Sequence, residues 1–115
     1  MPRELLLLDE MITVCERALE ICRAHSVAEL ESLPDARDAL LWNLTVLGEA
    51  ANQLPSGFRA AHGSVRWRGP ISLRNRIVHG YWSVDLQVVH NVAVRDLPVF
   101  LDAIRDLVVS LDQGE

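Results

Sequence analysis

Residues 74–82 read R-N-R-I-V-H-G-Y-W and bring together two guanidinium groups, an imidazole and a phenol with no acidic residue among them. Arginine binds phosphate oxygens with a planar, permanently charged fork, and histidine exchanges protons near neutral pH. Metal-free cleavage of an RNA phosphodiester needs a base for the ribose 2′-hydroxyl, an acid for the leaving 5′-oxygen and a cation for the developing phosphorane charge. The segment holds the side chains that this reaction requires.

His79 and Arg74 are the candidate catalytic residues of this segment. His79 would act as base or acid, which contributes about 10²- to 10⁴-fold in rate, and Arg74 would hold the phosphorane oxygens. The product would be a cyclic 2′,3′-phosphate, and DNA, which lacks the 2′-hydroxyl, should resist. Asn75 would share a helix face with His79, so its amide could orient the imidazole or bind a phosphate oxygen.

The spacing of Arg74 and His79 turns their side chains about 140° apart on a straight helix. Within one chain, only the length of the arginine or the end of the helix could bring both to one phosphate. A two-fold dimer offers another solution, because an isologous interface brings two copies of the motif to one axis. The spacing alone also fits a surface helix with a solvated arginine and a histidine that caps its C-terminus.

The charges are sorted along the chain. The formal net charge of −5 argues against a nucleic-acid partner, because phosphate contacts dominate such binding. Residues 50–84, however, hold five of the 11 basic residues, all of them arginine, and none of the 16 acidic residues. This sorting favours a local anion site, although arginines also cover apolar surface with their stems.

Apolar residues recur at intervals of three and four, which predicts amphipathic helices and no strands. We expect helices at residues 3–25, 34–55 and 70–78 and from residue 86 onward. The fold class is then all-α, an up-and-down bundle of four to five helices that forms a single domain over residues 1–115. The motif would lie at the end of the short third helix.

Four residues and one segment should shape these helices. Gly48 should mark a close crossing with another helix, and Gly80 should take the left-handed conformation just past a helix end. Asp85 should cap the last helix, and Pro98 should kink or split it. Residues 55–69, with one proline and three glycines, should form a loop with an irregular turn.

Composition argues against a membrane protein and against a metal site. No apolar run approaches the roughly 20 residues of a membrane span, and Asp9 and Glu10 end the first run too early for a signal peptide, so we expect a cytoplasmic protein. Cys15 and Cys22 lie about 10 Å apart on one helix, too far for a disulfide. We interpret them as buried thiols that form no metal cluster with His25, and we expect no metal or cofactor.

Two tryptophans and two histidines have alternatives that the sequence leaves open. Trp67 and Trp82 would either stack on RNA bases or pack in the core or an interface, with packing favoured. His62 and His90 are isolated along the chain, which favours surface or packing roles for both.

Glu49 and Tyr81 also have two interpretations each. Glu49 is a polar residue in a strongly apolar helix, where it would face solvent or pair with Arg74 or Arg76 and hold it in place. Tyr81, taken alone, is more typical of a half-buried packing residue. Its phenol nevertheless lies only two residues from the imidazole of His79.

Arg74, His79 and Tyr81 form the pattern R-x4-H-x-Y, which resembles the signature of the HEPN superfamily and, within it, of the HepT-like ribonuclease toxins. The other matching positions are residues 47–51, Trp67, residues 74–81 and residues 96–98. The resemblance covers nearly the whole chain. It departs at residues 69–73, where a glycine–methionine pair more often precedes the arginine, and at His90, which stands in place of an aromatic.

This resemblance implies an all-helical homodimer in which two motifs form a composite RNase site. Arg74 and His79 would be its catalytic residues, with support from Asn75, Arg76 and Glu49. RNA would be the substrate.

The resemblance also implies a partner, a minimal nucleotidyltransferase antitoxin of the MntA type, in a type VII-like toxin–antitoxin system. That enzyme would transfer AMP from ATP to Tyr81. An adenylylated phenol two residues from the imidazole would exclude RNA by bulk and phosphate charge. Toxin and antitoxin would then assemble as a homodimer or a larger hetero-oligomer.

Two other classes of protein remain open. A non-catalytic helical subunit of a nucleotidyltransferase would bind nucleotide or substrate and leave RNA intact. A purely structural dimerisation module would carry the motif by coincidence.

Overall fold

The computed structural model describes residues 2–114, and every regular element within them is a helix. The elements in chain order are α1 (Arg3–Ala24), α2 (Val27–Ser32), α3 (Pro34–Gln53), α4 (Ser56–Ala61), α5 (Arg68–His79), the 3-10 turn η1 (Tyr81–Ser83) and α6 (Leu86–Gly114). The all-α prediction is confirmed. The four predicted helices are present as α1, α3, α5 and α6, and α2 and α4 are additional short helices.

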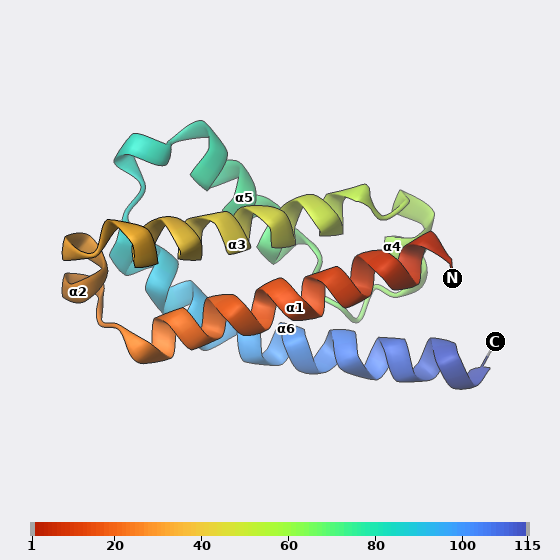
Figure 1. Cartoon of the computed structure of the whole chain (residues 1–115). Coiled ribbons are helices and arrows are strands. Elements are labelled where there is room, and N and C mark those ends of the chain that lie inside the picture. The colour runs from red at the N-terminus through yellow and green to blue at the C-terminus, as the bar shows by residue number, and fades with distance from the viewer. Residues whose placement is uncertain (1, 115) are drawn as a thin grey trace.

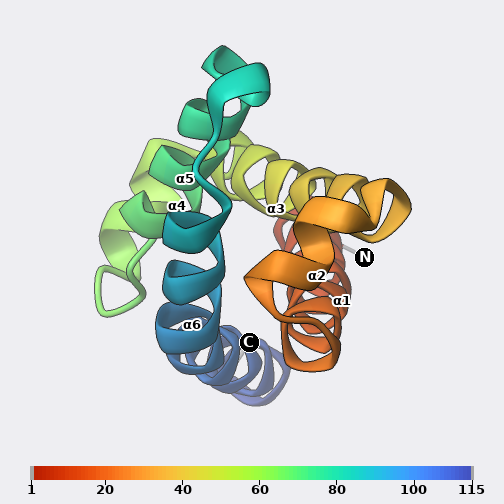
Figure 2. The same cartoon turned by 90° about the vertical axis from the view of Figure 1, so that its left-hand side faces the viewer.

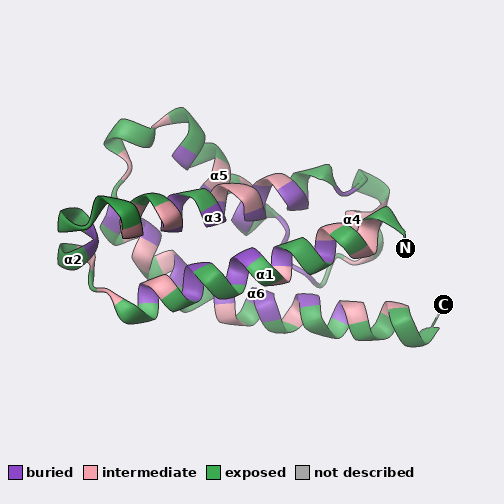
Figure 3. Ribbon diagram, in the orientation of Figure 1, coloured by how far each residue is buried: buried purple, intermediate pink, exposed green. Residues whose placement is uncertain are grey.

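Helix α1 packs along both α3 and α6, and these three helices form the body of the bundle (Figure 1). Each presents buried residues to the interior and exposed residues to solvent (Figure 3). The largest fully buried side chains are Leu8, Met11, Cys15, Leu30, Leu40, Leu41, Leu44, Leu47, Leu54, Ile77, Val89 and Ile104. They belong to one apolar cluster, so the core follows the three-and-four periodicity of the sequence.

Helix α5 crosses α3 at Gly48, as predicted for this glycine. A Cβ atom at Gly48 would lie 2.2 Å from Cβ of Arg74 and 2.5 Å from the carbonyl oxygen of Pro70. Both distances are shorter than any real contact, so only glycine allows this approach. From the crossing, the end of α5 and η1 rise away from the bundle (Figure 2).

Helices α2 and α4 were not predicted. Helix α2 begins with a capping box, in which Ser26 Oγ accepts from the Glu29 backbone N–H (3.1 Å) and Glu29 Oε1 accepts from the Ser26 N–H (2.8 Å). This S-x-x-E spacing is a helix-start signal in the sequence. Helix α4 occupies residues 56–61 of the predicted loop at 55–69, which is therefore wrong there. Pro55 is the N-cap residue of α4, with a φ of −56° and a ψ of 143°.

The prediction for Gly80 is wrong. Its φ is −138° and its ψ is 36°, outside the left-handed region, because the chain continues directly into the 3-10 turn of η1. The cap at Asp85 is confirmed, since Oδ1 accepts from the backbone N–H of Gln87 (2.9 Å) and Val88 (3.3 Å). Pro98 does not split α6, which runs through it as one helix and changes direction along its length (Figure 1).

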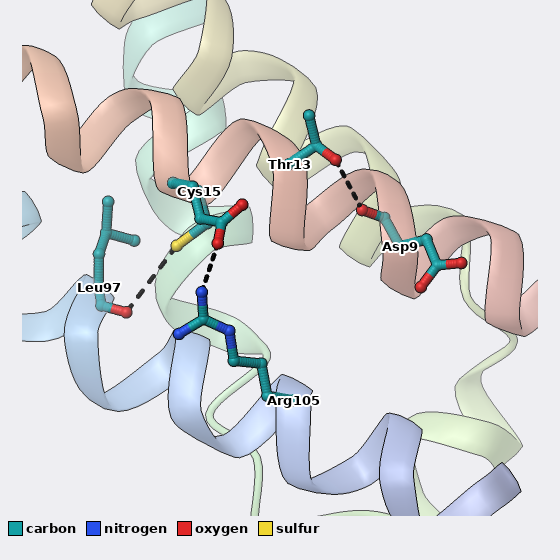
Figure 4. Close-up of polar contacts among 6 residues, drawn as sticks. Asp9, Thr13, Cys15, Leu97 and Arg105 are labelled. Atoms are coloured by element: carbon teal, nitrogen blue, oxygen red, sulfur yellow. Dashed lines mark hydrogen bonds and ion pairs between the residues drawn. The ribbon is translucent and has the colours of Figure 1, made fainter.

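Both cysteines are buried free thiols, as predicted. Burial raises the pKa of the Cys15 thiol to about 12 and that of Cys22 to about 11, so both are neutral. Cys15 Sγ donates to the carbonyl oxygen of Leu97 at 3.8 Å, and Arg105 forms an ion pair with Glu16 beside it (Figure 4). These contacts join α1 to α6, which gives Cys15 a structural role.

His90 also joins α1 to α6, which confirms the packing interpretation for this residue. Its Nε2 lies 3.1 Å from the carbonyl oxygen of Cys22 and 3.0 Å from that of His25, where α1 ends. An Nε2–H donated there supplies the helix end with a hydrogen-bond donor.

Within residues 2–114, no helix combines the length and apolar character of a membrane span.

Candidate active site on helix α5

The buried residues of α5 decide where its polar residues point. Pro70, Leu73 and Ile77 are buried, whereas Asn75 and His79 are exposed. At 100° per residue, the exposed pair lies on the side of the helix opposite the core. The helix therefore carries His79 on its outer face.

Arg74 occupies the flank of α5 that faces α3. Its Nη2 lies 3.2 Å from Glu49 Oε1, and its Nη1 donates to Asn75 Oδ1 at 3.0 Å. Of the two pairings considered for Glu49, the structure contains the one with Arg74. Nε of Arg74 is buried, with no hydrogen-bond partner among the described residues. The guanidinium is thus held against α3 by a carboxylate that is itself partly exposed.

His79 is the last residue of α5 and is exposed. Among residues 2–114, no side-chain hydrogen bond joins it to Arg74 or to Asn75, whose amide oxygen is engaged by the arginine. One chain does not bring the two candidate catalytic side chains together, in keeping with their expected angular separation. The imidazole is left open to solvent at the C-terminal end of α5.

Tyr81 makes a contact that the sequence did not predict. Its hydroxyl donates a hydrogen bond to Asp38 Oδ1, on α3, at 2.7 Å. The hydrogen bond raises the pKa of Tyr81 above its ordinary value and lowers that of Asp38 below its ordinary value. Arg37 Nε lies 3.4 Å from the same Oδ1, so one carboxylate oxygen connects a phenol and a guanidinium.

The ring of Tyr81 lies at one wall of a shallow hollow between η1 and the beginnings of α3 and α6. The residues lining this hollow are Glu31, Arg37, Leu41, Tyr81, Trp82, Val84, Asp85 and Leu86. The Tyr81 and Trp82 rings meet edge to face with centroids 5.6 Å apart. Aromatic, cationic and acidic groups therefore surround the phenol.

The aromatic residues near the motif divide into two kinds. Trp67 is 6% exposed, meets Phe100 edge to face and donates its indole N–H to the carbonyl oxygen of His62, which confirms packing for Trp67. The His62 ring packs on Phe58 with centroids 4.6 Å apart, which confirms a packing role for this histidine too. Trp82 is 97% exposed, so core packing is wrong for it. Its position in the 3-10 turn projects it away from the bundle.

Asp38 is the residue of this region that sequence reasoning missed. It lies 43 positions before Tyr81, beyond the reach of any helical or turn spacing. One weak signal is present: Asp38 and Glu49 are polar residues 11 positions apart, close to three full turns, so they share the side of α3 that meets Tyr81 and Arg74. Within residues 2–114, no group of three or more His, Cys, Asp or Glu side chains is arranged to hold a metal.

Comparison with known proteins finds one family. Residues 11–107 match the model of the family described as ribonuclease HepT-like. A candidate RNase of Caldanaerobacter subterraneus subsp. tengcongensis is 23% identical over 100 residues, which cover 87% of this chain and 89% of that protein.

Two archaeal proteins are similar over shorter stretches. A probable ribonuclease HepT of Thermococcus cleftensis is 30% identical over 60 residues, which cover 52% of this chain and 54% of that protein. A candidate RNase of Methanocaldococcus jannaschii is 24% identical over 74 residues, which cover 64% of this chain and 61% of that protein. No solved structure matches the chain.

Proposed function

This chain belongs to the ribonuclease HepT-like family, and on that premise we propose that it is the toxin of a toxin–antitoxin pair and cuts RNA without a metal ion. Family membership and the RNase names of its relatives support RNA cleavage. Arg74 and His79 are the proposed catalytic residues, and Asn75, Arg76 and Glu49 the proposed supporting ones. We also propose that the site is completed by a second copy of the chain.

The observation that carries the proposal is the outer face of α5. Arg68, Ser72, Arg76 and His79 recur at intervals of four and three and are all exposed. Neither Arg68 nor Arg76 is ion-paired within residues 2–114, and α5 contains no acidic residue. This face is about 16 Å long at 1.5 Å per residue, so an RNA strand along it would meet guanidinium groups on the way to the imidazole.

The separation of Arg74 from His79 supports a dimeric site. The imidazole on the outer face of one α5 and the guanidinium on the flank of the other can approach one phosphate across a two-fold axis. The helices that carry the motif and its partners also expose apolar side chains: Trp82 on η1 is 97% exposed, Trp42 on α3 66% and Val78 on α5 45%. Burying such side chains is the usual source of binding free energy at an interface between copies.

In the proposed reaction, the imidazole of His79 takes the proton of the ribose 2′-hydroxyl as that oxygen attacks phosphorus. The P–O5′ bond breaks, an imidazolium protonates the leaving 5′-oxygen, and a 2′,3′-cyclic phosphate remains. Two copies of His79 would supply base and acid. Arg74 would stabilise the phosphorane charge, while Glu49 keeps its guanidinium in one position.

Control by adenylylation is the second part of the proposal. An MntA-type nucleotidyltransferase would transfer AMP from ATP to Tyr81, in a complex that is a toxin homodimer or a larger hetero-oligomer with the antitoxin. Tyr81 is 37% exposed, so its hydroxyl can be reached from solvent. The added phosphate would lie near His79 and repel the RNA backbone.

The nuclease proposal is tested with purified full-length protein and a single-stranded oligoribonucleotide in EDTA. Wild type should cleave it to a product with a cyclic phosphate, and a DNA oligonucleotide of the same sequence should stay intact. His79→Ala and Arg74→Ala should each lose activity while remaining folded and dimeric. Arg17→Ala, at an exposed position of α1, is the matched control and should cleave normally.

Four results would count against particular parts of this proposal. Cleavage by His79→Ala at the wild-type rate would remove the histidine from catalysis, and loss of all cleavage in EDTA would remove metal independence. RNA left intact by wild type, together with binding of ATP, would favour a non-catalytic subunit of a nucleotidyltransferase. For the adenylylation, intact mass is measured after incubation with antitoxin and ATP, and a gain that survives Tyr81→Phe would exclude the tyrosine.

A further inference from the structure

The contact between Tyr81 and Asp38 places a carboxylate on the one tyrosine of the chain. At 2.7 Å, the distance from the hydroxyl to Oδ1 is within the range in which a general base removes a proton. Asp38 takes no part in the bundle core, because its side chain is exposed and lies at the beginning of α3. The contact is also the only side-chain hydrogen bond between η1 and another helix within residues 2–114.

A phenol needs such a base before it can accept a nucleotidyl group. The ordinary pKa of tyrosine is about 10, so near neutral pH the hydroxyl carries its proton. Asp38 does not ionise the phenol in advance, because the hydrogen bond that it accepts from the hydroxyl raises the pKa of Tyr81. The proton must therefore leave while the new bond to phosphorus forms, at which point the ring oxygen becomes strongly acidic.

We propose that Asp38 accepts the phenolic proton when the Tyr81 hydroxyl attacks the α-phosphate of ATP, so that this chain supplies the base for its own modification. The inference rests on the proposed adenylylation of Tyr81. In the step, the bond between Oη and the α-phosphorus forms and the bond from that phosphorus to the bridging oxygen breaks. Pyrophosphate leaves, and the proton passes to Asp38 and from there to water.

The surroundings of the hydroxyl suit a nucleotide in this orientation. Arg37 shares Oδ1 of Asp38 with the phenol and lines the hollow beside it, where its charge can meet a phosphate. Trp82 lines the same hollow with a nearly fully exposed indole, on which an adenine ring can stack. The carboxylate thus contacts the acceptor hydroxyl directly, and the guanidinium and the indole line the hollow beside it.

Asp38→Asn separates the basic role from a merely structural one. The amide oxygen of asparagine can still accept the hydrogen bond from Tyr81, so η1 stays in place, but the amide cannot hold the proton. Asp35→Asn is the matched control, since Asp35 is an exposed acid one turn earlier on α3. The assay follows the gain of one adenylyl mass by each full-length protein with the nucleotidyltransferase antitoxin, Mg²⁺ and ATP.

We expect Asp38→Asn to be adenylylated at least about 10²-fold more slowly than wild type, the lower end of what a general base contributes. Asp35→Asn should react at the wild-type rate. Both variants should cut RNA normally before modification and should bind the antitoxin as wild type does, which shows that docking is intact.

Adenylylation of Asp38→Asn at the wild-type rate would overturn the inference and leave the proposed function standing, with the base supplied by the transferase. No mass gain by wild type would instead reject adenylylation and, with it, any role for Asp38 in that step. RNA cleavage is measured in the same samples, so the nuclease activity is judged independently of both results.

Discussion

The bundle of α1, α3 and α6 and the arm formed by α5 and η1 differ in how much of each is buried in the apolar core. The bundle has seven buried residues in α1 and eight each in α3 and α6, nearly all apolar. The arm has three buried residues in α5 and none in η1. Two polar contacts, from Arg74 to Glu49 and from Tyr81 to Asp38, connect the arm to α3.

This difference explains why the candidate chemistry lies on the arm. A buried apolar side chain stabilises the fold only while it is shielded from water. A catalytic or modified side chain, in contrast, must be accessible to RNA or to a nucleotide. Exposed ion pairs and hydrogen bonds contribute little to stability, commonly about 0–1 kcal/mol, so they can be exchanged for contacts with a ligand. The bundle therefore acts as a rigid support, and the arm presents groups that can change partners.

The largest expected contrast is between substitutions at two nearby residues of α5, one of which should affect RNA cleavage and the other the stability of the fold. His79→Ala should lower the rate of RNA cleavage at least about 10²-fold with little change in the free energy of unfolding, because His79 is exposed. Ile77→Ala, two residues earlier and 1% exposed, should destabilise the fold by about 2–5 kcal/mol. Urea unfolding and a cleavage assay on both variants measure the two effects. A large loss of stability in His79→Ala would contradict the assignment of this residue to function rather than to folding.

The crossing at Gly48 is the place where arm and bundle can be forced apart. Gly48→Ala should cost about 1–3 kcal/mol or more, because the new methyl group would overlap Arg74 and the backbone of Pro70. It should also displace Arg74 and reduce cleavage. Gly57→Ala in α4, where nothing lies within 4 Å of the new atom, is the control and should be neutral or slightly stabilising in urea unfolding.

The tyrosine–aspartate contact can be read directly by ultraviolet absorbance, since Tyr81 is the one tyrosine. Asp38 raises the pKa of Tyr81, so Asp38→Asn should lower it towards its ordinary value, seen as tyrosinate absorbance appearing at lower pH. The contact stabilises the fold at pH values below the ordinary pKa of tyrosine. This stabilisation is lost as the pH rises through the raised pKa of Tyr81 in the folded protein. At the acid side, it is lost as pH falls through the lowered pKa of Asp38. Identical titrations of wild type and Asp38→Asn would show that the contact is absent in solution.

The smallest predicted effect concerns the far end of the arm. Arg68→Ala should weaken RNA binding a few-fold and reduce the slope of log K against log salt by about 0.7, the value for one phosphate contact on a single strand. The KM for RNA should rise and kcat should stay unchanged, because Arg68 lies three turns from His79. Arg23→Ala, at another exposed arginine, should leave both the KM and the slope unchanged, and a change in kcat for Arg68→Ala would argue against a binding role.

The bundle was largely predictable, because each of its helices repeats its apolar residues at a local period. The same reasoning found the close crossing at Gly48 and the cap at Asp85, both of which depend on residue types suited to one backbone environment. It failed at Gly80, where a common helix ending was assumed and the following 3-10 turn requires another conformation. It also passed over the capping box of Ser26 and Glu29, although that signal is local and readable.

The sequence by itself determined the all-helical fold, the positions of the long helices and a motif typical of RNase chemistry, because all three depend on residues close together in the chain. Only the tertiary structure decided that Glu49 pairs with Arg74 rather than Arg76, that Trp82 is exposed while Trp67 is buried, and that Asp38 meets Tyr81. These contacts join residues 25 and 43 positions apart, and no helical period relates them. They exist because α5 crosses α3 at Gly48, and the angle of that crossing is set by packing in three dimensions.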